Sequence, residues 1–176
     1  MTDPDDLRYP IGRFRPLAAI LPGVRAAHIE TLRLLPERLC DAVAGLNDAQ
    51  LDTPYRQDGW SLRQVVHHLA DSHVNAYIRF KLALTEDWPT IKPYDEAAWA
   101  QLPDAQLPIE DSLRFVDALH ARWVSLLRAM SEDDFQKGFT HPERGRMTLT
   151  LNLSIYEWHA RHHVAQITGL RQRMGW

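Results

Sequence analysis

Two histidines near the end of the chain have a spacing that suits metal binding. His159 and His163 stand four residues apart in the phrase YEWHARHH, so on a helix their imidazole rings lie one turn apart on the same side. That side is apolar, with Ile155 and Leu170, and an imidazole without a partner is costly to bury there. Helices offer two imidazoles to one metal ion with this geometry. The alternative is a hydrogen-bonded pair of core histidines.

A second histidine cluster supplies candidates for a third ligand. His67, His68 and His73 lie on another predicted helix. At the helical repeat, His73 points into the apolar face, whereas His67 and His68 lie toward its two margins. Periodicity alone therefore favours His73, but a metal site at the edge of a bundle, open to a cleft, favours a margin position such as His68. The spacing leaves this choice open.

The histidine pair lacks the neighbour that zinc proteases use as a general base. Ala160 follows His159 where those enzymes have a glutamate, which disfavours a protease of that kind. Three neutral imidazoles would leave a divalent ion its full charge and an open position. Such a centre can acidify water or a thiol, and a thiol begins at a pKa near ~8.5 instead of ~15.7. The missing base mildly favours thiol chemistry over hydrolysis.

Four long helices are expected to position these residues. The hydrophobic periodicity predicts helices over residues 21–46, 62–86, 109–130 and 150–174. Ser61 and Gln64 form a capping-box pattern before the second helix, and Gly175 is a stop signal after the last. Pro36 interrupts the first helix, which we expect to be one kinked helix. The fold class predicted is all-α, a four-helix bundle with long connecting loops.

The connections between these helices carry turn residues. Residues 47–60, 87–108 and 138–148 are predicted as loops, and Ser131 is expected to cap a short turn through Phe135. The alternating phrase TLTLNL resembles a strand, but without a partner strand we favour the start of the last helix there. Residues 1–16, with three prolines, are predicted to form an irregular arm.

Composition excludes several classes of protein. The 176 residues are 45% hydrophobic and 24% charged, which indicates one globular domain over residues 1–176. A net charge of −3 argues against nucleic acid as a partner, and the single Cys40 excludes an intramolecular disulfide. The acidic, proline-broken N-terminus does not resemble a signal peptide, and no apolar run approaches the ~20 residues of a membrane span. We therefore expect a cytoplasmic protein with no membrane partner.

Several phrases of the sequence resemble one protein family. The chain is similar to the DinB-like superfamily, specifically its YfiT-like branch of metal-dependent hydrolases. The resemblance covers nearly the whole chain, and the phrases that carry it are YPIGRF at Tyr9, LDTPYRQDGW at Leu51, RQVVHHLADSHVNAYIRFKLALTE at Arg63, KPYDEAAW at Lys92, LHARW at Leu119, FTHPE at Phe139, YEWHARHH at Tyr156 and RMGW at Arg173.

The resemblance implies a metal centre and an assembly. It implies an up-down four-helix bundle with an atypical crossing order, one divalent metal ion per subunit (zinc or nickel), and a homodimer. The implied metal ligands are the histidine before Leu69, which is His68, together with His159 and His163. Some relatives have histidines where this chain has Arg161 and Gln166, so an extended histidine cluster is reduced here.

Three functions are compatible with these residues. The first is a metal-dependent hydrolase with a small-molecule substrate. The second is a metal-dependent S-transferase, because members of the wider superfamily resemble enzymes that use low-molecular-weight thiols such as bacillithiol or mycothiol. The third is a non-catalytic metal-binding stress protein, which a closed four-ligand site would favour. Candidate groups behind the ligands are Asp71, Ser72 and Asn75. Candidate groups that would hold a carboxylate of a thiol substrate are Arg56 and Arg161.

Overall fold

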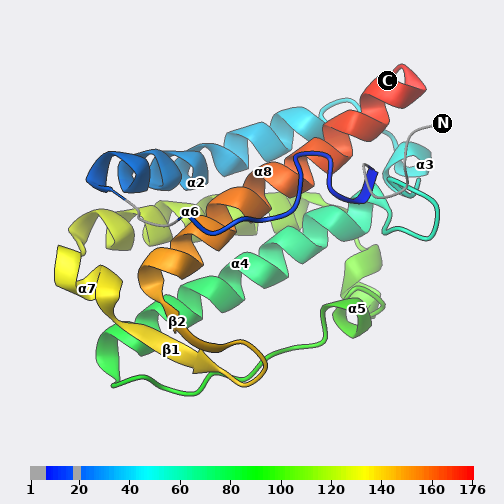
Figure 1. Cartoon of the computed structure of the whole chain (residues 1–176). Coiled ribbons are helices and arrows are strands. Elements are labelled where there is room, and N and C mark those ends of the chain that lie inside the picture. Colours follow the sequence, from blue (N-terminus) through cyan, green and yellow to red (C-terminus); the bar gives the residue numbers. More distant parts are fainter. Residues whose placement is uncertain (1–6, 18–20) are drawn as a thin grey trace.

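Four long helices form the body of the protein (Figure 1). The computed structural model describes residues 7–17 and 21–176, so residues 1–6 of the predicted irregular arm lie outside the described residues. The long helices are α2 (Pro22–Val43), α4 (Leu62–Thr85), α6 (Glu110–Ala129) and α8 (Leu149–Met174). The predicted all-α four-helix bundle is confirmed.

Local capping interactions set the ends of the two helices that carry the histidine clusters. The Ser61 hydroxyl accepts from the Gln64 amide while the Gln64 side chain accepts from the Ser61 amide, which is the predicted capping box at the start of α4. The Thr148 side chain accepts from the Leu151 amide at the start of α8. Gly175 ends α8 at φ 72°, in the left-handed region.

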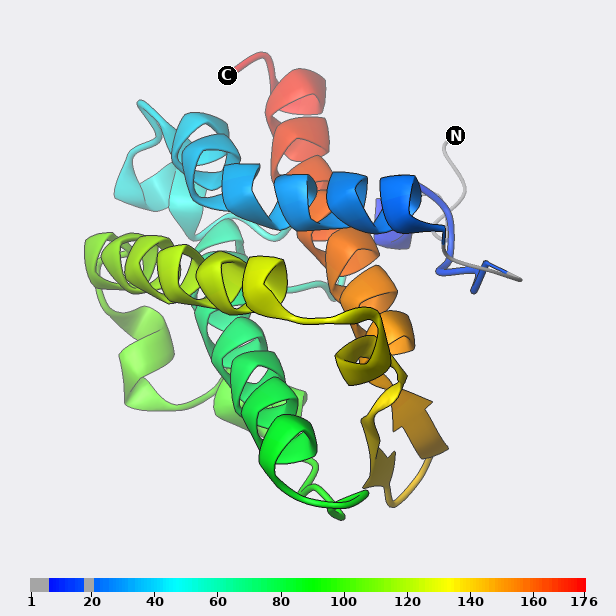
Figure 2. The ribbon, with the colours of Figure 1, turned by 90° about the vertical axis from the view of Figure 1, so that its left-hand side faces the viewer.

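The helices are not arranged in the order of the chain. Helix α2 packs chiefly against α6 and α8, and α4 packs chiefly against the same two helices, so α2 and α4 lie at opposite corners of the bundle. The chain colours in Figure 1 show that α2 and α8 run from left to right and that α4 and α6 run from right to left. In Figure 2, α2 and α6 lie across the view, whereas α4 and α8 run up and down it. This order is atypical, because the directions of consecutive long helices do not simply alternate: α4 and α6 run in the same direction.

Short elements occupy two connections that were predicted as plain loops. Helix α3 (Asp48–Leu51) lies within residues 47–60, and α5 (Glu96–Trp99) and the 3-10 helix η1 (Pro103–Gln106) lie within residues 87–108. The loop predictions were wrong there because the side chains of Asn47 and Asp95 cap single turns. Helix α7 (Glu132–Gln136) begins after Ser131 as predicted. The connection from α4 to α6 must return along the bundle, since α4 alone is about 36 Å long at 1.5 Å per residue.

Residues 138–148 form a β-hairpin and not the predicted loop. Strand β1 (Gly138–His141) pairs antiparallel with β2 (Gly145–Thr148), in the register that places Phe139 opposite Met147. Both of these side chains are buried, and such cross-strand pairs stabilise a hairpin. Gly145 supplies the positive φ of the turn. Both strands lie within residues 138–148, and each has only four residues, which is too short to give a recognisable alternating pattern.

The core lies between the four long helices. Its largest fully buried side chains are Trp123, Phe80, Phe135, Phe139, Leu32, Leu35, Leu39, Leu62, Leu69, Leu127, Leu149 and Leu153. Among the described residues there is no helix with both the length and the apolar character that crossing a membrane requires.

Replacing Gly138 by alanine is expected to destabilise the hairpin. A Cβ at this position would lie 2.2 Å from the carbonyl oxygen of Met147 and 2.8 Å from the Trp88 ring, so the paired strand must shift. We expect the free energy of unfolding to fall by about 1–3 kcal/mol, as for other overpacked sites. Thermal unfolding of Gly138→Ala measures this. Gly23→Ala is the control, because its Cβ meets nothing within 4 Å and alanine favours a helix. Equal melting temperatures for Gly138→Ala and the unmodified protein would contradict the packing argument.

Candidate functional site

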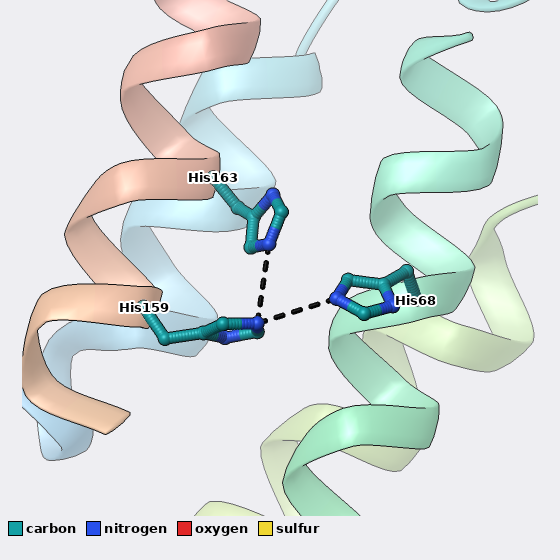
Figure 3. Close-up of side chains that lie close together, drawn as sticks. All are labelled: His68, His159 and His163. Atoms are coloured by element: carbon teal, nitrogen blue, oxygen red, sulfur yellow. Dashed lines mark hydrogen bonds between the residues drawn. The ribbon is translucent and has the colours of Figure 1, made fainter. Parts of the chain in front are cut away.

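Three imidazole rings converge between α4 and α8. The Nε2 atom of His159 lies 3.2 Å from the Nε2 atom of His68 and 3.1 Å from that of His163 (Figure 3). The three residues form a group that could hold a metal ion, with their ligand atoms within 4.8 Å of one another. The structure therefore brings His68 to the histidine pair on α8, as the family resemblance implied. His73, which periodicity favoured, is not part of this triad.

His73 instead lies directly behind His159. It is fully buried, and its Nε2 atom lies 3.2 Å from the Nδ1 atom of His159. On its other side, the Nδ1 atom of His73 lies 2.9 Å from the Nε2 atom of His120, whose own Nδ1 atom lies 2.7 Å from the carbonyl oxygen of Leu32. A continuous row of hydrogen bonds thus leads from the triad through three histidines to a backbone carbonyl.

The direction of this row is fixed by its last member. A carbonyl oxygen only accepts, so Nδ1 of His120 carries the hydrogen and its Nε2 atom accepts. The Nδ1–H of His73 then donates to His120, and the Nδ1–H of His159 donates to His73. When all three rings are neutral, the Nε2 atom of His159 presents a lone pair to the triad.

His163 is oriented by a second backbone carbonyl. The side-chain nitrogen of Gln166 donates to the carbonyl oxygen of Arg8 at 3.1 Å, which turns the Gln166 oxygen toward Nδ1 of His163 at 2.8 Å. The Nδ1–H of His163 donates to this oxygen, so the Nε2 atom of His163 also presents a lone pair to the triad. Gln166 also contacts Nε2 of His162 at 3.0 Å.

Two lone pairs that face each other at 3.1 Å repel unless a cation lies between them. Burial disfavours a proton as that cation, because desolvation lowers the pKa of His159 and of His163 well below the usual value and lowers the pKa of His68 to about 4. A divalent metal ion needs neutral imidazole nitrogens as ligands. The donor set of the three histidines therefore fits such an ion.

A cavity of about 460 Å³ opens beside the triad. The Trp60 ring lies 4.5 Å from the His68 ring between centroids and forms part of the wall. The other lining residues come mostly from the N-terminal segment, the loop before α4 and α8, and they are Arg8, Tyr9, Tyr55, Arg56, Asp58, Gly59, Glu96, Arg144, Ile155, Trp158, His162 and Gln166. The triad is thus reached from an open, partly charged cleft.

A second cavity, of about 350 Å³, is also lined by His159. Glu96, Arg144 and Ile155 line both cavities, and Arg79 and Tyr156 line the second one alone. A small molecule beside the triad therefore has space in two cavities that share part of their walls.

The other candidate residues that the sequence suggested differ in where they lie relative to the triad and its cleft. Ser72 accepts from the Tyr156 hydroxyl through its backbone carbonyl at 3.1 Å, and the Asn75 side chain donates to the Asp71 carbonyl. Asp71 lines a separate cavity with His67. Of the two arginines suggested for a substrate carboxylate, Arg56 lines the cleft.

Arg161 does not line the cleft. It is exposed, pairs with Glu157, and borders a groove between α2 and α8 on another face. The hypothesis that it holds a carboxylate of a substrate at the triad is therefore wrong, because its position on α8 turns it away from the His159 face.

Two residues of the site were missed by reasoning from the sequence. The sequence pattern assigns no role to His120, yet this residue is buried and anchors the row behind His159. Gln166 was noted only where relatives have histidine, yet it orients His163. The spacing of Gln166, three residues after His163, is a signal that would have found it. No spacing reveals His120, since its partners lie on other helices.

The buried histidines predict how stability depends on pH in the metal-free protein. Burial lowers the pKa of His120 to about 4, below the usual 6.5, so between these values the unfolded chain binds more protons than the folded one. We therefore expect the free energy of unfolding to fall as pH falls from about 6.5 toward 4. Urea unfolding with a chelator at pH 7, 5.5 and 4.5 measures this.

The control for this pH dependence is His120→Phe, which removes the titrating group. In this variant the free energy of unfolding should fall less steeply as pH falls, with a slope smaller by up to about 1.4 kcal/mol per pH unit. A stability that is constant between pH 7 and 4.5 would contradict the prediction.

Comparisons with known proteins identify relatives over nearly the full chain. The DinB superfamily profile matches residues 31–167. A protein of Bacillus mycoides (strain KBAB4) is 52% identical over 171 residues, which cover 97% of this chain and 99% of that protein. A protein of Bacillus cereus (strain B4264) is 52% identical over 172 residues, with 98% and 99% covered. Both are named, provisionally, as metal-dependent hydrolases.

Solved structures agree with the fold. YfiT from Bacillus subtilis, described as "a probable metal-dependent hydrolase with an unusual four-helix bundle topology", superposes with a TM-score of 0.94 at 48% identity over 97% of this chain and 99% of that one. A second four-helix bundle protein, TT2238, has a TM-score of 0.56 at 16% identity over 80% of this chain and 94% of that one, and shows the fold alone. The matched profile and the extent of these relatives show that the chain belongs to the DinB superfamily.

Proposed function

We propose that this protein is a metal-dependent enzyme whose divalent ion, zinc or nickel, is held by His68, His159 and His163. The observation that carries the proposal is that the Nε2 atoms of His159 and His163 lie 3.1 Å apart and each presents a lone pair to the other. Each lone pair is fixed in place through a separate backbone carbonyl. A core histidine pair of purely structural function would place a hydrogen between the two nitrogens. Here both hydrogens are directed away from the triad.

The protein's own groups define what such a site can do. An ion held by three neutral ligands supplies Lewis acidity at the position that the protein leaves open. His73 and Gln166 hold the ligand rings in orientation from behind. The cleft of about 460 Å³ has the size of a small-molecule site, which favours an enzyme over a non-catalytic metal-binding stress protein.

Hydrolysis of a small molecule is the reaction class that the relatives' names support. A hydrolase needs a group that accepts a proton from water. Ala160 follows His159 where zinc proteases have the glutamate base. Two carboxylates, Asp58 and Glu96, line the cleft and are exposed, and they are the candidates for this role in a hydrolase.

Transfer of a low-molecular-weight thiol to an electrophile is the second candidate function. Its specific support is the same alanine, because a thiol ionises far more readily than water and needs no dedicated base. The proposal in either form includes a small-molecule substrate in the cleft and a homodimer, which the resemblance to the family implies.

Metal binding is tested by comparing two adjacent histidines on α4. We expect about one zinc or nickel ion per chain, and we expect His68→Ala to abolish tight binding, because two remaining ligands lose a bond and the fixed geometry. Metal analysis after dialysis against a weak chelator measures occupancy. His67→Ala is the matched control, because His67 is also buried but bonds to Ser112 and Leu107. Full occupancy in His68→Ala would place the site elsewhere.

The reaction class is tested with metal-loaded protein and two assays. One follows consumption of a small thiol by electrophiles, and the other follows hydrolysis of activated esters and amides without thiol. Because the site lacks an adjoining glutamate, we expect thiol conjugation to be faster and to vanish in His159→Ala. Hydrolysis without thiol that is lost in the same variant would instead establish the hydrolase.

A further inference from the structure

A proline lies in the interior of α2, one turn after the residue that anchors the row of histidines. Pro36 has no backbone N–H, so the carbonyl of Leu32, four residues earlier, lacks its partner within the helix. A proline ring in a helix interior also crowds the carbonyl four residues earlier. Leu32 is fully buried, so its carbonyl would be costly to leave without a donor.

His120 on α6 fills the place of the missing donor. Its Nδ1 atom donates to the Leu32 carbonyl at 2.7 Å, the shortest link of the row. The next links are 2.9 Å from His73 to His120 and 3.2 Å from His159 to His73. In each of these two links, the accepting ring must have its lone pair on Nε2. His120 has its lone pair there only because its Nδ1–H donates to the Leu32 carbonyl.

We propose that Pro36 and His120 are positioning residues of the metal centre. By removing one backbone hydrogen bond from α2, Pro36 makes available the acceptor that sets the tautomer of His120, then of His73, and finally of the ligand His159. This inference rests on the proposed metal site and goes beyond it, because it assigns a role in metal affinity to Pro36. Three hydrogen-bonded groups separate this residue from His159: the Leu32 carbonyl, His120 and His73.

The effect of replacing Pro36 distinguishes a positioning role from a purely structural one. Proline in a helix interior is unfavourable relative to alanine, so Pro36→Ala should raise the melting temperature of the metal-free protein whatever its role. The backbone N–H that the substitution introduces would bond to the Leu32 carbonyl and compete with His120. Positioning therefore predicts opposite effects, with higher stability and weaker metal binding in one variant.

The experiment measures both quantities for Pro36→Ala. Zinc affinity by competition with a chromophoric chelator should fall about tenfold, the lower end of the range for groups behind metal ligands, while thermal unfolding with chelator shifts upward. Glu37→Ala is the matched control, because this neighbour on α2 is exposed and keeps its backbone N–H. It should leave the zinc affinity unchanged.

A double variant tests whether both residues act through one bond. His120→Phe alone should lower zinc affinity and stability, since it leaves the Leu32 carbonyl without a donor. Adding Pro36→Ala should restore stability, because the introduced alanine supplies a backbone donor, but should not restore or further reduce the zinc affinity. Such a pattern is the non-additivity expected for two residues in one network. Independent losses of affinity that add would overturn the proposal.

Imidazole nitrogen-15 NMR of the metal-free protein separates this proposal from the proposed function. In the unmodified protein, the Nε2 atom of His159 should have the shift of an unprotonated nitrogen, and in Pro36→Ala it should move toward a mixture of tautomers. The tautomer result stands even if no metal binds, so failure of the metal proposal is recognised separately. An unchanged tautomer together with unchanged zinc affinity in Pro36→Ala would overturn the inference.

Discussion

The hydrogen bond from His120 to the carbonyl of Leu32 is the interaction on which the site depends. A histidine ring can place its hydrogen on either nitrogen, and in a row of rings each choice dictates the next. A backbone carbonyl has no such choice, because it only accepts. One fixed acceptor at the end of the row therefore determines that the hydrogen of His159 is on Nδ1, so that the Nε2 atom facing the triad has a lone pair. Gln166 and the Arg8 carbonyl do the same for His163.

The order of the helices makes this row possible. Leu32 lies on α2, His120 on α6, His73 on α4 and His159 on α8, so each step of the row joins two helices that pack against one another. In a bundle whose helices were neighbours in chain order, α2 and α6 would lie diagonally opposite and the first bond could not form. The connection from α4 back to α6 (Figure 1) thus has a direct consequence for the chemistry of the site.

The walls of the cleft come from the less regular parts of the chain. Trp60 precedes α4, Arg144 lies in the turn of the β-hairpin, and Arg8 belongs to the N-terminal segment. The three histidines of the triad, by contrast, all lie on long helices with buried inner faces. Groups on a packed helix keep their orientation, whereas groups on loops can change between relatives without loss of the fold.

The sequence by itself determined the four helices, the capping box before α4, the glycine that ends α8 and the histidine pair on α8. These features depend on residues close in the chain: Ser61 with Gln64, His159 with His163, and the apolar repeat. The choice of His68 over His73 as the expected ligand came from the family resemblance, because periodicity, which places His73 in the apolar face and His68 at its margin, cannot tell a ligand from a supporting neighbour.

Only the tertiary structure decided the roles of His73 and His120, the hairpin and the helix order. The roles of the two histidines and the helix order depend on groups that are far apart in the sequence, as His120 and Leu32 are, 88 residues apart. The hairpin is local, but its strands of four residues are too short to give a recognisable alternating pattern. Periodicity reports which face of a helix is buried, but it contains no information about which other helix that face meets. The tautomer of a metal ligand is therefore a property of the packed bundle, although every residue that sets it was already present in the sequence.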